Sequence, residues 1–195
     1  MKILTGKFRG KTIRFKANPY LRPTADKARK AIFDMLQGGL DGKRVLDLFS
    51  GTGALGLEAL SNGAAFVTFV EKNKNQAATI EKNLVALGLE IKGQVLVSDA
   101  LEMISSLYEK REVYDIIFLD PPYQQRLGAK AMEVLTRLPI WNKQTIIFLE
   151  CHEKEPAPHC RGEVSSPGRG NRAPTLIKSR TYGDTKILVY SFSSN

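Results

Sequence analysis

Residues 45–60, VLDLFSGTGALGLEAL, join a short apolar run to a glycine-rich turn and a second apolar segment. The run before the glycines predicts a buried strand, and the spacing of leucine and alanine after them predicts a helix. Glycines between the two elements allow a tight turn and a close approach of the backbone to a ligand. This unit predicts an α/β fold.

Further apolar runs follow and alternate with segments of helical period. The alternation predicts parallel strands joined by crossover helices, which cover both faces of a mostly parallel sheet. The predicted strands are residues 44–49, 66–70, 94–98, 115–120 and 145–150, and the predicted helices are residues 53–61, 73–88, 100–110 and 126–138. Two more runs, 176–182 and 185–192, flank Gly183 and Asp184 and predict an antiparallel hairpin at one sheet edge.

The first 40 residues precede this pattern and predict an appendage, with residues 41–195 as the main domain. We expect a small basic hairpin around a turn at residues 6–10, followed by a helix from about residue 24 to residue 36 with Thr24 as its N-cap. Residues 153–174 are rich in Pro, Gly, Ser and Arg and lack an apolar period, which predicts a mobile surface loop.

Acidic residues fall at the carboxyl ends of four successive predicted strands, where parallel strands share one edge of the sheet. These residues are Asp47, Glu71, Asp99 and Asp120. Open α/β sheets bind ligands at the carboxyl ends of their strands. The sequence therefore predicts an acidic ligand-binding cleft in a basic protein.

The glycine turn fits two classes of cofactor. Gly51, Gly53 and Gly56 satisfy the G-x-G-x-x-G pattern, and Glu71 follows Gly51 by twenty residues, as in a dinucleotide site. An NAD-type oxidoreductase is therefore one alternative. Asp47 favours a different cofactor, because its carboxylate would repel a pyrophosphate but attract the sulfonium and amino groups of S-adenosylmethionine. We therefore expect S-adenosylmethionine.

The motif DPPY, residues 120–123, ends the fourth predicted strand of the core. The amino group on a nucleobase is a poor nucleophile, so its attack on a methyl group needs acceptors that hold its two N–H bonds. Asp120 offers one acceptor and the Pro121 carbonyl another, while Pro121 and Pro122 stiffen the turn. Tyr123 can stack on an extruded base. These features predict methylation of a base amino group.

The net charge of +9 is concentrated near the amino terminus. Residues 1–30 contain ten Lys and Arg residues against Asp26 alone, and the rest of the chain is balanced at 19 basic and 19 acidic residues. A basic segment with interspersed aromatic residues suits a polyanion with exposed bases. We expect RNA binding by this segment, with the candidate residues Lys7, Arg9, Lys11, Arg14 and Arg22.

The composition excludes several other classes of protein. No stretch approaches the ~20 consecutive apolar residues of a membrane span, and residues 1–11 contain no apolar signal region, so we expect a cytoplasmic protein without membrane contact. Cys151 and Cys160 are too few for a disulfide framework. Together with His152 and His159 they match no familiar zinc spacing, and no metal is expected.

Taken together, several motifs resemble the bacterial 16S ribosomal RNA guanine-N2 methyltransferases. The motifs are GKFRGK (6–11), LRPTADKAR (21–29), VLDLFSGTGALGLEAL with the following Glu71, and IIFLDPPY (116–123). The resemblance covers nearly all of residues 1–150 and resumes at about 178–190. It implies a Rossmann-like class I methyltransferase sandwich that uses S-adenosylmethionine and acts on ribosomal RNA or the assembling small ribosomal subunit. The segment 153–174 is longer than the family pattern.

The resemblance also implies roles for individual residues. Asp47, Gly51 and Gly53 would line the donor pocket, Glu71 would bind the ribose, and Asp99 with Ala100 would border the adenine. Thr24 would lie near the methionine end of the cofactor. The catalytic residues would be Asp120, Pro121, Pro122 and Tyr123.

Two further alternatives stay open at this point. A DNA adenine-N6 methyltransferase shares the DPPY chemistry, but this chain has little room for the target-recognition region that such enzymes usually add. A non-catalytic RNA-binding protein that has kept the fold would not need both sets of motifs.

Overall fold

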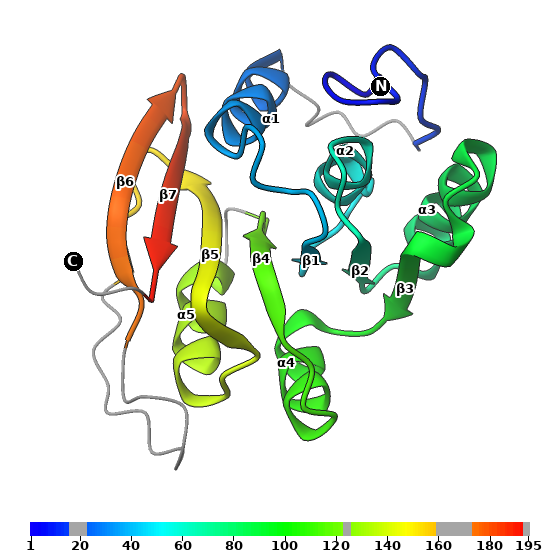
Figure 1. The fold of residues 1–195 in the computed structure, drawn as a ribbon. Helices are drawn as coiled ribbons and strands as arrows, with labels where there is room; N and C mark the ends of the chain where they lie inside the picture. Colours follow the sequence, from blue (N-terminus) through cyan, green and yellow to red (C-terminus); the bar gives the residue numbers. More distant parts are fainter. Residues whose placement is uncertain (16–22, 123–125, 159–172, 193–195) are drawn as a thin grey trace.

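The computed structural model describes residues 1–15, 23–122, 126–158 and 173–192, and its centre is a seven-stranded sheet (Figure 1). The strand order is β3-β2-β1-β4-β5-β7-β6. The first five strands in this order are parallel, whereas β7 is antiparallel to β5 and to β6. The bounds are β1 Arg44–Asp47, β2 Phe66–Glu71, β3 Gly93–Val97, β4 Tyr114–Leu119, β5 Trp141–His152, β6 Thr175–Tyr182 and β7 Thr185–Ser191.

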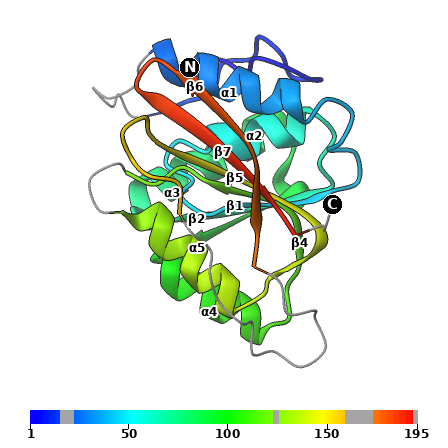
Figure 2. The ribbon, with the colours of Figure 1, turned by 90° about the vertical axis from the view of Figure 1, so that its left-hand side faces the viewer.

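Helices cover both faces of this sheet. Figure 2 shows α1 and α2 above the sheet and α4 and α5 below it, and α3 packs on the same side as α1 and α2. The bounds are α1 Pro23–Met35, α2 Ala54–Ser61, α3 Lys74–Leu87, α4 Ala100–Glu109 and α5 Leu127–Arg137, with a 3-10 turn at Glu90–Lys92. None of the helices in the described part of the chain has the length and apolar character needed to cross a membrane.

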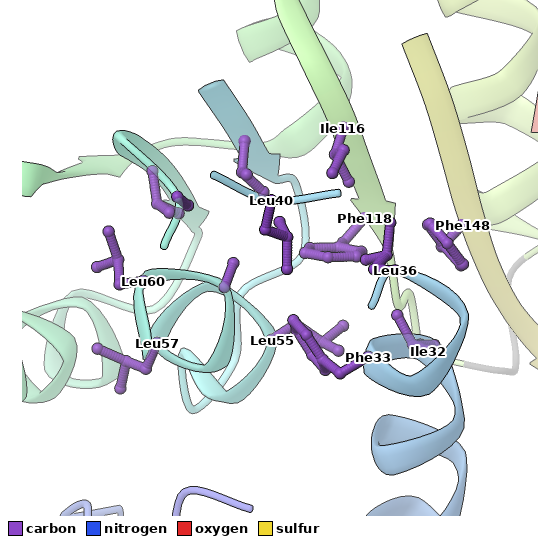
Figure 3. Close-up of a cluster of buried hydrophobic side chains, with 14 of the residues drawn as sticks. Ile32, Phe33, Leu36, Leu40, Leu55, Leu57, Leu60, Ile116, Phe118 and Phe148 are labelled. Carbon is purple, nitrogen blue, oxygen red and sulfur yellow. The ribbon is translucent and has the colours of Figure 1, made fainter. Parts of the chain in front are cut away.

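Each helical layer buries its own cluster of side chains against the sheet, because parallel strands are apolar on both faces. Phe118 and Phe148, on neighbouring strands, contact one another with ring centroids 5.8 Å apart, and Phe33 of α1 packs on Phe118 at 5.9 Å (Figure 3). On the other face, Leu119 and Leu149 belong to a second buried cluster. Because side chains alternate between the two faces along each strand, these clusters also show which face of the sheet a residue at a strand end lies on.

The strand order creates one point where the chain reverses its direction of travel across the sheet. From β1 the chain moves outward to β2 and β3, then returns to place β4 on the other side of β1. Ligands of open α/β sheets bind at the carboxyl ends of the strands on either side of such a switch point. The site is therefore expected at the ends of β1 and β4, where Asp47 and Asp120 lie.

The observed elements confirm the predicted α/β class, the parallel core and the antiparallel hairpin near the carboxyl terminus. One local prediction is wrong, and another is met only in a reduced form. The helix α1 begins at Pro23, so Thr24 lies in its first turn and is not its N-cap. The basic hairpin around residues 6–10 contains no strand, only a single antiparallel bridge between Lys2 and Thr12. Its backbone instead bonds to neighbouring helices.

Candidate functional site at the ends of β1 and β4

The glycine turn between β1 and α2 has a conformation that requires glycine. Gly51 and Gly53 have φ angles of 52° and 76°, in the left-handed region that residues with a Cβ rarely adopt. The Gly53 N–H donates to the Ser50 carbonyl at 2.6 Å, and the Ser50 hydroxyl donates to the Asp47 carbonyl at 2.7 Å. The turn is therefore tight and is held from within.

Gly56, the third glycine of the motif, has a packing role. A Cβ at this position would lie 2.2 Å from Cε1 of Phe69 on β2. The missing side chain therefore lets α2 approach the sheet closely. Gly56 also donates its N–H to the Asp47 carboxylate, at 3.0 Å from Oδ2.

Asp47 is a buried carboxylate with one oxygen in use. Its Oδ1 has no hydrogen-bond partner among the described residues. Burial raises the pKa of Asp47 to about 7, the bond from Gly56 acts in the opposite direction, and repulsion from Glu71 adds to the increase. A buried acceptor beside a glycine turn suits a ligand that brings a cation or a donor, and it opposes a pyrophosphate.

Glu71 holds the turn from the end of β2. Its Oε2 accepts from the Gly51 N–H at 2.7 Å, and its Oε1 accepts from the Asn73 N–H at 2.7 Å. Both oxygens are acceptors at the rim of the sheet, where ribose hydroxyl groups can donate to them. Glu71 therefore lies beside the turn, as expected from the sequence.

Asp99 is the N-cap of α4, two residues beyond the end of β3. Its Oδ1 accepts from the Leu101 N–H at 2.9 Å, and Lys72 donates to its Oδ2 at 3.3 Å. Desolvation acts to raise the pKa of Asp99, but the bonds from Leu101 and Lys72 outweigh it, so this pKa is lowered. Asp99 is thus a capping residue at the rim, and Ala100 behind it is buried in the second core cluster.

The DPPY motif follows β4 directly. Asp120 is exposed, Pro121 is buried and Pro122 is exposed. A Cβ on Gly128 would lie 3.3 Å from Cγ of Pro121, so Pro121 is close to the start of α5. Tyr123 lies outside the described residues, as does the side chain of Thr24.

Glu150 is an acid of this site that the sequence reasoning missed. In the register of β4 with β5, Leu119 is paired with Leu149, so Asp120 and Glu150 each follow a paired position and are expected on the same face. Glu150 is buried. An acid at the end of the apolar run TIIFLE was the available signal, since the other four acids also end such runs.

The neighbouring acids affect the ionisation of Asp120. Desolvation by the surrounding protein, then repulsion from Glu150 and from Asp47, raise the pKa of Asp120 well above its ordinary value. The carboxyl group of Asp120 therefore holds its proton more tightly than an ordinary aspartic acid does.

The candidate RNA-binding residues are exposed where the structure describes them. Lys7, Arg9, Lys11 and Arg14 are exposed, and Arg22 lies outside the described residues. Cys151 is a buried thiol on β5, and burial raises its pKa to about 11. His159 and Cys160 lie outside the described residues, and within the described ranges no three His, Cys, Asp or Glu side chains form a metal-binding group.

Comparisons with known proteins show the family and the fold of this chain. The family model described as conserved hypothetical protein 95 matches residues 1–191. The ribosomal RNA small subunit methyltransferase D of Buchnera aphidicola is 35% identical over 153 residues, which is 78% of each chain. The protein of the same name from Haemophilus influenzae is 30% identical over 191 residues, covering 97% of this chain and 93% of that one.

Solved structures confirm the predicted class I methyltransferase sandwich. The putative methyltransferase yhhF from Escherichia coli superposes with a TM-score of 0.81 and 26% identity, over 100% of this chain and 99% of that chain. The resemblance found in the motifs is thereby confirmed over almost the whole length. The chain therefore belongs to the family described as conserved hypothetical protein 95, together with the bacterial ribosomal RNA small subunit methyltransferases D.

Proposed function

We propose that this protein transfers a methyl group from S-adenosylmethionine to the exocyclic N2 of a guanine in 16S ribosomal RNA. The names of the relatives support methyl transfer to ribosomal RNA of the small subunit. The choice of guanine and of N2 comes from the motif resemblance. One observation carries the proposal: the buried Asp47 carboxylate, with an unused oxygen beside a glycine turn, lies one strand away from the Asp120-Pro121-Pro122 motif.

The donor pocket is assigned to the turn and to the strand ends around it. S-adenosylmethionine supplies a methyl group activated by a sulfonium. Asp47, Gly51 and Gly53 would contact its methionine portion, with Thr24 nearby from α1. Glu71 would accept from the ribose hydroxyl groups, and Asp99 with Ala100 would border the adenine. The positive charge of the donor is the reason why acids at these positions favour it over a dinucleotide.

The catalytic role is assigned to the motif after β4. Asp120 and the Pro121 carbonyl accept hydrogen bonds from the two N–H groups of the guanine amino group. Pro122 stiffens the turn, and Tyr123 stacks on the base. As the new N–C bond forms and the C–S bond breaks, the amino nitrogen must lose one proton. The Asp120 carboxylate can accept that proton and release it to water, provided that it is ionised beforehand.

The appendage of residues 1–40 is proposed to hold the RNA, through Lys7, Arg9, Lys11, Arg14 and Arg22. The RNA is either free ribosomal RNA or part of an assembling small subunit. Exposed cations displace counterions from phosphates, which provides affinity without base recognition.

The test is to map methylated nucleosides in 16S ribosomal RNA from a strain that lacks the gene. Nucleoside mass spectrometry should show the loss of one N2-methylguanosine, restored by the wild-type gene and not by one encoding Asp120→Ala. An unchanged 16S ribosomal RNA with lost N6-methyladenine in DNA would favour the DNA methyltransferase instead. Purified protein that binds NADH tightly and has no affinity for S-adenosylmethionine would favour an oxidoreductase.

A further inference from the structure

The amino-terminal segment is bonded to α2 through a buried acid. Glu58 is 1% exposed, and its carboxylate accepts from the Leu4 N–H at 2.9 Å, from the Thr5 N–H, and from the Thr5 hydroxyl at 2.6 Å. Arg29 of α1 lies 3.8 Å from the same carboxylate. A carboxylate buried in this way is stable only with such partners, so the hydrogen bonds of Glu58 fix the backbone of residues 4 and 5 against α2.

The end of α2 and the middle of α3 hold the rest of the segment. The Ser61 carbonyl accepts from the Lys7 N–H at 2.7 Å, and the Ser61 hydroxyl accepts from the Phe8 N–H at 2.9 Å. The side chain of Asn83 bonds both backbone groups of Arg14, at 2.8 and 2.7 Å. Figure 1 shows this dark blue loop beside α2.

Buried apolar residues fix the two ends of the loop. Ile3 and Ile13 are each 2% exposed and belong to the same core cluster as Phe33 and Phe118. The Ile3 N–H donates to the Lys11 carbonyl at 3.0 Å and the Ile13 N–H donates to the Met1 carbonyl at 3.0 Å, so the two ends are also tied to each other. The backbone between them is therefore held at both ends and at its centre.

Exposed cations are mounted on this fixed backbone. Lys7, Arg9, Lys11 and Arg14 all face solvent, whereas the residues that anchor the loop face the helices. A fixed array loses less conformational freedom on binding than a flexible basic tail does, and this advantage is realised only by a partner whose phosphates are also fixed in space. A flexible polyanion would be bound by charge alone.

We propose that the loop of residues 3–13, held in place by the positioning residue Glu58 and by Ser61, is a preformed surface that selects folded RNA over flexible single strands. The inference rests on the proposed RNA methyltransferase function and specifies its substrate class. It assigns to α2 two separate roles: its first turn borders the donor site, and its second half fixes the RNA-binding loop.

Two glycines of the loop offer a matched test that leaves every charge in place. Gly6 and Gly10 have similar φ angles of 74° and 84°. A Cβ on Gly6 would lie 2.1 Å from the Ser61 carbonyl oxygen, whereas a Cβ on Gly10 would meet nothing within 4 Å. Gly6→Ala should therefore dislodge the loop from α2, and Gly10→Ala imposes comparable backbone strain without that clash.

The measurement is the affinity of each variant for a folded 16S ribosomal RNA fragment and for poly(U), at one fixed salt concentration. Gly6→Ala should bind the folded fragment about tenfold more weakly, through the lost preorganisation, and poly(U) nearly as well as the wild type does. Gly10→Ala should resemble the wild type with both polymers. S-adenosylmethionine affinity should be unchanged in both variants, which also reports that the main domain is folded.

Thr5→Ala provides a second variant in case Gly6→Ala does not fold. It removes the hydroxyl that donates to Glu58 and accepts from the Asn62 amide at 2.8 Å, and it should show the same selective loss in smaller measure. Wild-type affinity of Thr5→Ala and Gly6→Ala for the folded fragment would overturn the proposal, as would an equal loss for both polymers. A wild-type protein that binds neither RNA, and that does not bind small ribosomal subunits either, would instead refute the proposed function itself.

Discussion

Asp47 and Gly56 are joined by a hydrogen bond of 3.0 Å that runs from the first turn of α2 to the end of β1. Gly53, the N-cap residue of α2, has no side chain to cap the helix, and the Asp47 carboxylate takes over one free N–H. A helix amino terminus favours an anion, yet the pKa of Asp47 is raised to about 7 because burial has the larger effect. A positively charged ligand beside this carboxyl group would favour its ionised form.

The first prediction concerns the pH dependence of donor binding. Because the pKa of Asp47 is about 7 in the ligand-free protein, its ionised form is lost as the pH falls below that value. Affinity for S-adenosylmethionine should therefore fall between pH 7.5 and pH 5.5, by at most about tenfold per pH unit. Calorimetric titration of the wild type and Asp47→Asn checks this, since titration of the donor itself affects both proteins equally.

A matched control for that series is Asp99→Asn. The pKa of Asp99 is lowered, so its carboxylate stays ionised throughout this pH range. Asp99→Asn should therefore keep the wild-type slope while Asp47→Asn loses it. An equal slope in wild type and Asp47→Asn would show that Asp47 does not face the charge of the donor.

The second prediction concerns stability without the donor. The pKa of Asp47 is 3.8 ordinarily and about 7 in the fold, so the buried group resists ionisation, and its destabilising effect grows as the pH rises between these values. Asp47→Asn keeps an acceptor for Gly56 but removes the charge. At pH 8 it should raise the free energy of unfolding by up to about 4 kcal/mol, and by much less at pH 5.

Urea unfolding of the two ligand-free proteins at both pH values measures this difference. A variant that is less stable than the wild type at pH 8 would mean that the Asp47 charge has a compensating partner.

The third prediction concerns the chemical step. Asp120→Ala should lower the single-turnover rate of methylation by roughly two to three orders of magnitude, because one positioned acceptor is lost in the transition state. Donor affinity should change much less. Rapid quench experiments with saturating donor measure the rate. If the variant reacts at the wild-type rate, Asp120 is only a turn residue after β4.

The pH dependence of the methylation rate tests whether Asp120 must be ionised for the reaction. Because the pKa of Asp120 is raised, the wild-type rate should increase with pH over a range that lies above that of an ordinary aspartic acid, as the carboxylate forms. Glu150→Gln removes a nearby negative charge, so the acidic limb of the profile should move to lower pH.

The fourth prediction concerns RNA affinity. Replacing Lys7, Arg9 and Lys11 with Ala should weaken RNA binding and flatten the plot of log affinity against log salt by up to ~0.7 to 0.9 per lost phosphate contact. Donor affinity should hardly change. The comparison is a variant that loses the same charge elsewhere, at three exposed lysines: Lys110 at the end of α4, Lys130 of α5 and Lys143 of β5. Equal slopes in both variants would show that the loop is an ordinary solvated surface.

The sequence predicts the sheet and its acidic rim well, because both depend on local patterns. The apolar runs are long enough to identify each parallel strand, and Asp47, Glu71 and Asp120 sit at or directly after the ends of these runs. Asp99 lies two residues beyond β3, where its side chain caps the next helix. The rim therefore follows from strand ends alone.

What the sequence does not predict depends on contacts between distant segments. Glu58 lies in the middle of a short helix and resembles a solvated helix residue, and only its bonds to Leu4 and Thr5, more than fifty positions away, show its role. The expected hairpin is reduced to one antiparallel bridge, because the backbone of residues 4–8 bonds to α2 in place of a partner strand. Glu150 comes to lie beside Asp120 only because β4 pairs with β5, and this pairing depends on the strand order of the whole sheet.

Transfer of an isotopically labelled methyl group tests the central claim most directly. Purified protein is incubated with labelled S-adenosylmethionine and with unmethylated 16S ribosomal RNA, free and within small ribosomal subunits, and the digested nucleosides are separated by mass spectrometry. We predict labelled N2-methylguanosine in at least one of the two substrates with the wild type, and a strongly reduced amount with Asp120→Ala. Label confined to another nucleoside, or absent from both substrates, would contradict the account.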